Sequence, residues 1–133
     1  MAAIMEESVK RLLFWTPRIF CIAFAVFVSL FALDVFGEGY SVFETVLAFL
    51  VHLIPTGIIL IVLAVSWRWE WMGSIAFTAL GAVYLVTFWD RDFSWPTYVI
   101  MSGPLFLLGV LFLINWLYRK QLRAGSKNGI QFR

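Results

Sequence analysis

The sequence predicts an all-α integral membrane protein, an antiparallel bundle of four transmembrane helices joined by short loops. Hydrophobic residue types make up 62% of the 133 residues and charged types only 14%, whereas soluble domains carry about 45–50% and about 25%. Four apolar stretches are each long enough for one span, which needs about 20 residues. The connections between them are so short that neighbouring helices must run antiparallel.

The composition excludes several classes of protein. Ten Lys and Arg residues against eight acidic residues give a net charge of only +2, so no basic domain is present that could bind nucleic acid. Cys21 is the only cysteine and His52 the only histidine, which excludes an internal disulfide and a zinc site of ordinary spacing. No phosphate-binding glycine loop or nucleophile elbow occurs. We therefore expect no metal, no cofactor and no enzyme activity.

Residues 1–16 form a predicted cytoplasmic or interfacial segment, for which two structures are open. Apolar residues recur at helical spacing in 9–13, opposite charged ones, which is typical of a short helix lying in the membrane surface. Thr16 and Pro17 are then an N-cap and a first helical residue. The alternative is one helix that continues through Pro17, because proline is tolerated as a kink in a span.

A transmembrane domain is predicted over residues 17–118, with spans at about 17–36, 44–65, 70–89 and 96–118. Gly37 ends the first span, since glycine accepts the left-handed conformation there. Pro55 and Gly57 predict a kink inside the second span. Residues 119–133 are too polar for a further span and form a predicted basic cytoplasmic tail.

The charges predict the orientation of the bundle in the membrane. Nine of the ten cations fall in the N-terminal segment, the second loop and the tail, whereas the opposite side holds only Arg91 and five carboxylates. Because cationic short loops stay in the cytoplasm, we expect both termini to be cytoplasmic. All seven tryptophans fall near predicted span ends, where indole prefers the headgroup level, and are predicted interfacial anchors: Trp15, Trp67, Trp69, Trp71, Trp89, Trp95 and Trp116.

His52 is the leading candidate for chemistry, because it lies inside a span, about 12 Å from Glu44 along the helix axis. An ionisable group at that depth is a functional candidate by default. With Thr56 it would line a path for a solute or proton, or it would ligate a tetrapyrrole. We favour a structural interpretation, in which a neutral imidazole points into the bundle and bonds a polar group on another helix. The Thr56 hydroxyl is free to bond back to the His52 carbonyl.

Small residues on the third span predict a helix-packing seam. Ser74, Thr78 and Ala82 are spaced four residues apart, and Gly73 and Gly81 flank them. Small side chains let helix backbones approach closely, so we expect this face to contact another helix, within the chain or in a second protomer.

Charged residues near the span ends receive structural interpretations. Arg18 lies one residue inside the first span and is expected to snorkel toward the headgroups, with a buried pair to Glu70 as the alternative. Arg68 and Glu70 are expected to anchor the turn at 67–71. A solvated acidic face is preferred to a cation site for the outward carboxylates, which are Asp34, Glu38, Glu44, Asp90 and Asp92.

Three short motifs carry a resemblance to a known family. They are Arg18-Ile19, the corner Asp34 with 36–39 (Phe-Gly-Glu-Gly), and the turn 67–70 (Trp-Arg-Trp-Glu) followed by Gly73. Over roughly residues 18–118 the chain resembles an uncharacterised family of small four-helix bacterial membrane proteins, catalogued as a domain of unknown function. The resemblance implies a four-span bundle in a bacterial inner membrane, and it implies no activity, cofactor or catalytic residue. Ser74 stands where a second glycine would be expected, which leaves the packing of the third helix open.

Two classes of function remain open from the sequence. The favoured one is a non-enzymatic structural or accessory subunit that packs laterally with other membrane protein subunits or with itself, because anchors and small-residue seams are plentiful and reactive groups are few. The rival is a small channel or transporter with His52 and Thr56 along its path, and a weaker alternative is tetrapyrrole binding at His52. Two-histidine haem ligation would need a second chain.

Overall fold

A computed structural model describes residues 7–122 of the chain, and these residues contain no strand. The elements in chain order are α1 (Glu7–Leu30), the 3-10 helix η1 (Phe31–Gly37), α2 (Val42–His52), α3 (Ile54–Arg68), α4 (Glu70–Phe88) and α5 (Trp95–Leu117). Four helical stretches are long and apolar enough to cross a membrane, namely Glu7–Gly37, Val42–Arg68, Glu70–Phe88 and Trp95–Leu117. The predicted all-α fold with four spans is confirmed.

The first span is a continuous helix that passes through Pro17. The structure therefore has the alternative of one helix that continues through Pro17, and no separate helix begins at Pro17. Proline removes one backbone donor from the helix, and side chains add donors on either side of it. The Thr16 hydroxyl donates to the carbonyl of Leu12 at 2.6 Å, and the Arg18 guanidinium donates to the carbonyl of Phe14.

The second span is broken at Leu53 into α2 and α3, with Pro55 in the first turn of α3. Ser41 is the N-cap of α2 and forms a capping box with Glu44. The Ser41 main-chain N–H donates to Glu44 Oε2 at 3.0 Å, and the Glu44 N–H donates to Ser41 Oγ at 3.4 Å. Because the box satisfies two donors that the helix start leaves open, it fixes where α2 begins.

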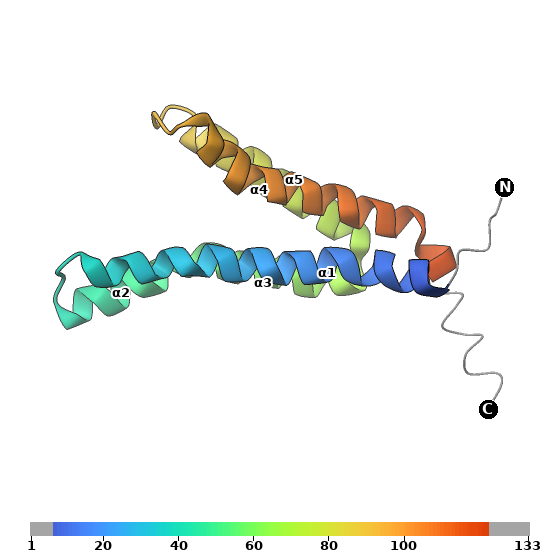
Figure 1. Ribbon diagram of the computed structural model, residues 1–133, viewed down its shortest axis with the longest axis horizontal. Coiled ribbons are helices and arrows are strands. Elements are labelled where there is room, and N and C mark those ends of the chain that lie inside the picture. The colour runs from blue at the N-terminus through green and yellow to red at the C-terminus, as the bar shows by residue number, and fades with distance from the viewer. Residues whose placement is uncertain (1–6, 123–133) are drawn as a thin grey trace.

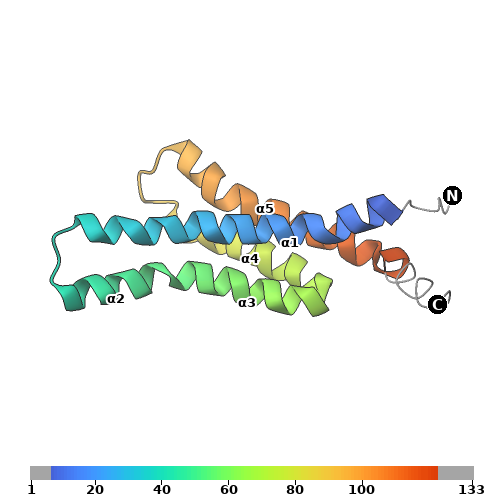
Figure 2. The same ribbon diagram turned by 60° about the horizontal axis from the view of Figure 1, so that its bottom comes forward.

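The helices form two diverging hairpins that give the molecule the shape of a V (Figure 1). One arm contains α1, η1, α2 and α3, and the other contains α4 and α5, whose mutual contact is the most extensive in the molecule. The arms meet at the end where α1 begins and α5 ends, which Figure 2 shows from a second direction. We call this end the apex of the V.

The core is built from all four long helices toward the apex. It consists of Cys21, Phe24, Ala25, Val28, Ile59, Leu63, Phe77, Leu105, Leu108 and Phe112. Phe77 of α4 and Phe112 of α5 stack with ring centroids 5.6 Å apart. By contrast, α2 packs against η1 and α3, and none of its residues is buried. The packing of the bundle therefore weakens from the apex toward the open end.

Candidate functional site

A fully buried arginine lies near the apex of the V. Arg18 has no exposed surface, and its guanidinium donates to the main-chain carbonyl of Phe14. The guanidinium carbon lies 3.6 Å from the centroid of the Phe14 ring and 5.2 Å from that of Trp67. Aromatic faces attract a cation in this geometry. The expectation that Arg18 snorkels to the headgroups is wrong, and the buried alternative is the one that the structure has.

Glu70 at the start of α4 is the acidic partner of this arginine. Its Oε1 lies 3.9 Å from Arg18 Nη2, and the two side chains are 9% and 0% exposed. Glu70 lies in the first turn of α4, as expected, but it forms the buried pair with Arg18 that was the alternative to anchoring. Arg68, in contrast, is exposed and lies with its guanidinium carbon 6.0 Å from the Trp69 ring centroid.

The ion pair connects the two arms of the V. Arg18 belongs to α1 and Trp67 to α3, whereas Glu70 belongs to α4 and Phe112 to α5. The Phe112 ring centroid lies 6.0 Å from the guanidinium carbon. One turn beyond Phe112, Asn115 is 2% exposed, and its Nδ2 has no hydrogen bond. A charged pair inside a membrane protein is a functional candidate by default, and this one has contacts on all four spans.

His52 is exposed at the C-terminal end of α2. Its Nδ1 lies 2.8 Å from the carbonyl oxygen of Ala48 on the same helix. Because a carbonyl only accepts, Nδ1 carries a hydrogen, and in the neutral imidazole Nε2 is then an acceptor. The expectation that the ring points into the bundle and bonds another helix is therefore wrong for the described residues.

Thr56 is buried on α3, and its hydroxyl has no hydrogen bond. The bond back to the His52 carbonyl, which the spacing permits, is not formed. Since one side chain is exposed and the other buried, the structure does not bring His52 and Thr56 to a common path.

The predicted seam on α4 divides into a buried and an exposed part. Gly73 and Gly81 are buried, and a Cβ atom at Gly81 would lie 3.1 Å from the Phe106 ring of α5. Ser74 and Thr78 approach Gly109 of α5, where a Cβ atom would lie 3.2 Å from the Ser74 carbonyl oxygen. Ala82 is exposed among the described residues, so no helix of residues 7–122 buries it as the seam predicts.

The predicted anchors and acidic residues lie mainly on the surface. Six tryptophans are exposed, namely Trp15, Trp67, Trp69, Trp71, Trp89 and Trp95, and Trp116 is partly buried. The five outward carboxylates are also exposed. Within residues 7–122 no three His, Cys, Asp or Glu side chains gather where they could share a metal ion.

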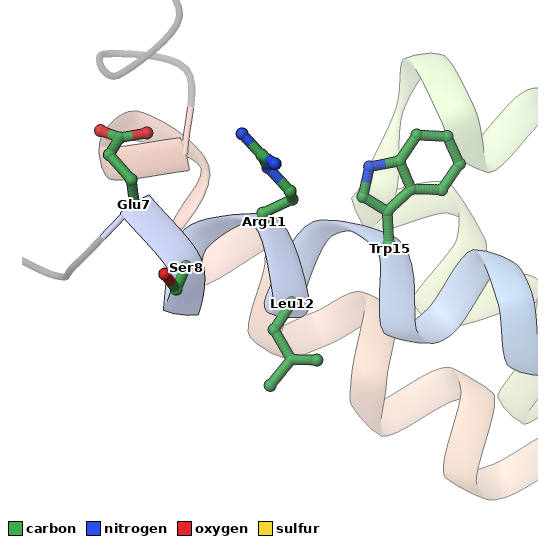
Figure 3. A pocket seen from close by; sticks show the side chains of 5 residues that line it. All are labelled: Glu7, Ser8, Arg11, Leu12 and Trp15. Atoms are coloured by element: carbon green, nitrogen blue, oxygen red, sulfur yellow. The ribbon is translucent and has the colours of Figure 1, made fainter.

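Two open depressions lie at the apex of the V. The first, of about 460 Å³, follows one side of α1, where Glu7, Arg11 and Trp15 project together while Leu12 points the opposite way (Figure 3). The second, of about 380 Å³, lies between the start of α4 and the end of α5, and it is lined by Trp71, Ser74, Ile75, Leu113, Trp116 and Arg119. His52, Thr56, Arg18 and Glu70 line neither depression.

The fold defines a multi-pass helical protein of membrane-spanning character with a buried ion pair between its spans. The family described as Domain of unknown function (DUF7670) matches residues 5–124, and the chain belongs to this family. The resemblance to an uncharacterised family is thereby confirmed. No curated protein and no solved structure matches the chain.

Proposed function

We propose that the protein is a non-enzymatic structural or accessory subunit that packs laterally with other membrane protein subunits or with itself. The observation that carries this proposal is α2, which forms half of a span and has no buried residue. Helices in membranes associate through close van der Waals packing and interhelical hydrogen bonds. A second polypeptide against α2 would supply the packing that this chain does not.

The geometry of His52 supports the same proposal. Its Nε2 is an acceptor that meets no donor among the described residues, on an exposed side chain within a span. Acyl chains offer no hydrogen-bond donor, and an unsatisfied polar group in an apolar medium is unfavourable by about 1–3 kcal/mol. A neighbouring polypeptide with a hydroxyl, amide or indole donor would satisfy this nitrogen.

The membrane and the orientation are part of the proposal. We place the protein in the inner membrane of a bacterium, with the apex of the V on the cytoplasmic side. The cation asymmetry of the sequence supports this orientation. The channel alternative finds no support in the positions of His52 and Thr56, because one is exposed and the other is buried.

Site-specific photocrosslinking in the native membrane tests the proposal. A benzophenone amino acid at Leu50 on α2, which is 56% exposed, should give a protein adduct of defined mass. The matched control is Val86 on α4, 81% exposed, which should react with lipid in the main. An absorption spectrum of the complex in gentle detergent also reports any bound tetrapyrrole.

Two variants of His52 sharpen this test. His52→Leu removes the acceptor and should reduce the adduct at Leu50, whereas His52→Gln keeps an acceptor and should reduce it less. A Leu50 adduct pattern identical to that of Val86, together with a monomeric mass in gentle detergent, would contradict lateral packing through α2.

A further inference from the structure

The depression between α4 and α5 is polar at its rim and apolar at its floor, as a lipid is polar at its headgroup and apolar along its chains. Trp71 lies at the start of α4 and Arg119 follows the end of α5, so both lie at the rim. Ile75 lies about 6 Å beyond Trp71 along α4, and Leu113 lies about 6 Å before the end of α5. Both of these deeper residues are exposed apolar side chains, at 61% and 40%. A charged, aromatic rim therefore leads to an apolar floor.

Hydrogen-bond donors without partners lie around this depression. The Ser74 hydroxyl, in the lining, makes no hydrogen bond to another described residue. The Trp116 Nε1 also has none, but this atom is buried beneath the surface of the depression. Arg119 lies with its guanidinium carbon 5.0 Å from the Trp116 ring centroid, and it pairs with no carboxylate among residues 7–122. The depression therefore offers donors and one positive charge, and no acidic residue lines it.

We propose that this depression binds the phosphate group of a membrane phospholipid, with the acyl chains along Ile75 and Leu113. A guanidinium is the preferred side-chain partner of a phosphate, because its N–H groups match two phosphate oxygens. A membrane lipid is favoured over free phosphate because only the lipid also covers the apolar floor.

The depression on α1 provides an internal comparison. It too has an arginine and a tryptophan, but Glu7 is part of its lining (Figure 3). Glu7 accepts from Lys10 at 3.2 Å, so one of the nearby cations is already paired. A carboxylate in the lining repels a phosphate, and the α4–α5 depression is therefore the better site.

Binding is tested on the purified full-length protein in detergent, with three probes added separately: dioleoylphosphatidylglycerol, dioleoylglycerol and inorganic phosphate. We expect phosphatidylglycerol to raise the midpoint of thermal unfolding and to remain bound in native mass spectrometry. Dioleoylglycerol lacks the phosphate and inorganic phosphate lacks the chains, so neither should reproduce this effect.

Variants locate the site. Arg119→Gln should weaken the apparent affinity for phosphatidylglycerol about tenfold, which is the loss expected for one charged hydrogen bond. Ser74→Ala removes the unpartnered hydroxyl from the lining, and should weaken it by a smaller factor. Arg68→Gln is the control, because Arg68 is an exposed cation of the same apex that lines neither depression, and it should bind as the parent does.

Three results would overturn the inference. Equal affinity of the parent and of both the Arg119 and Ser74 variants would contradict binding at this depression. Equal losses for Arg119→Gln and Arg68→Gln would show attraction to surface charge in general. If inorganic phosphate stabilised the protein as much as phosphatidylglycerol does, the depression would be a site for free anions and not for a lipid.

Discussion

Arg18 shows how one helix boundary decides the role of a residue. A helix that began at Pro17 would place Arg18 at the membrane surface, where a long cation snorkels. Because α1 begins at Glu7, Arg18 instead lies about 16 Å from the helix start. There the packing of α3, α4 and α5 against α1 buries it fully. At that depth its charge is stabilised by the Phe14 carbonyl, by aromatic faces and by Glu70.

Removing one member of the buried pair should destabilise the protein strongly. Glu70→Gln leaves the Arg18 charge buried without its acidic partner, and we expect the free energy of unfolding to fall by about 3–5 kcal/mol. The measurement is reversible unfolding in mixed micelles with increasing detergent denaturant. The surface pair of Glu7, 74% exposed, and Lys10, 18% exposed, gives the control, since Glu7→Gln should change this energy by less than about 1 kcal/mol.

A double variant distinguishes the contribution of the two charges from that of side-chain packing. Arg18→Met with Glu70→Met removes both charges and keeps much of the side-chain volume, so it should recover most of the loss seen for Glu70→Gln. An effect of Glu70→Gln no larger than that of Glu7→Gln would show that the buried pair does not fasten the arms.

At the scale of the element, the close packing of α4 against α5 depends on two glycines that flank the predicted seam. Gly73 and Gly81 are buried, whereas Ala82 in the predicted seam is exposed. The helical period identifies small residues on α4 but leaves open which of them meets a large side chain. Phe106 and Phe112 of α5 fill the space beside the two glycines, and this choice is made by packing.

Gly73 and Gly57 should respond in opposite ways to the same substitution. A Cβ atom at Gly73 would lie 2.7 Å from the Ser66 Cβ, so Gly73→Ala should destabilise the protein by about 1–3 kcal/mol through overpacking. At Gly57 nothing lies within 4 Å of the added atom, and Gly57→Ala should leave stability unchanged or raise it by up to about 1 kcal/mol. Thermal unfolding of both variants in one detergent measures the difference. Similar midpoints for the two would refute the close approach at Gly73.

At the scale of the whole molecule, the V has a tightly packed apex and an open end. The two outer connections, at 38–41 and 89–94, lie at the open end, and the turn at Trp69 lies at the apex (Figure 1). Among the described residues, six of the seven Lys and Arg side chains belong to the apex half of the molecule, and only Arg91, in the 89–94 connection, lies at the open end. The proposed orientation therefore puts the packed end in the cytoplasm and the open end outside.

Labelling of single cysteines tests this orientation in intact cells. In a Cys21→Ala background, Ser41→Cys should react with a membrane-impermeant maleimide from outside, and Gln121→Cys should react only after the cells are permeabilised. Cys21 itself is fully buried, so we expect it to contribute little background labelling even before it is replaced. Reaction of residue 121 before permeabilisation would reverse the assigned orientation.

The sequence by itself determined the all-α class, the four spans and the family, because each follows from hydropathy and short-range pattern. It also predicted a kink near Pro55, and the structure breaks the helix at Leu53, two residues before this proline. These features depend on residues close to one another in the chain, and local physics is enough to specify them.

Only the tertiary structure decided which polar residues are buried. Arg18 and Glu70 lie 52 positions apart in the sequence, and only the meeting of α1 with α4 brings them together. His52, the sole histidine, remained on the surface because no helix of the described chain packs over it. The sequence does not distinguish these two residues, since both are ionisable and both fall inside predicted spans. The difference is long-range helix packing, which buries the arginine and leaves the histidine exposed.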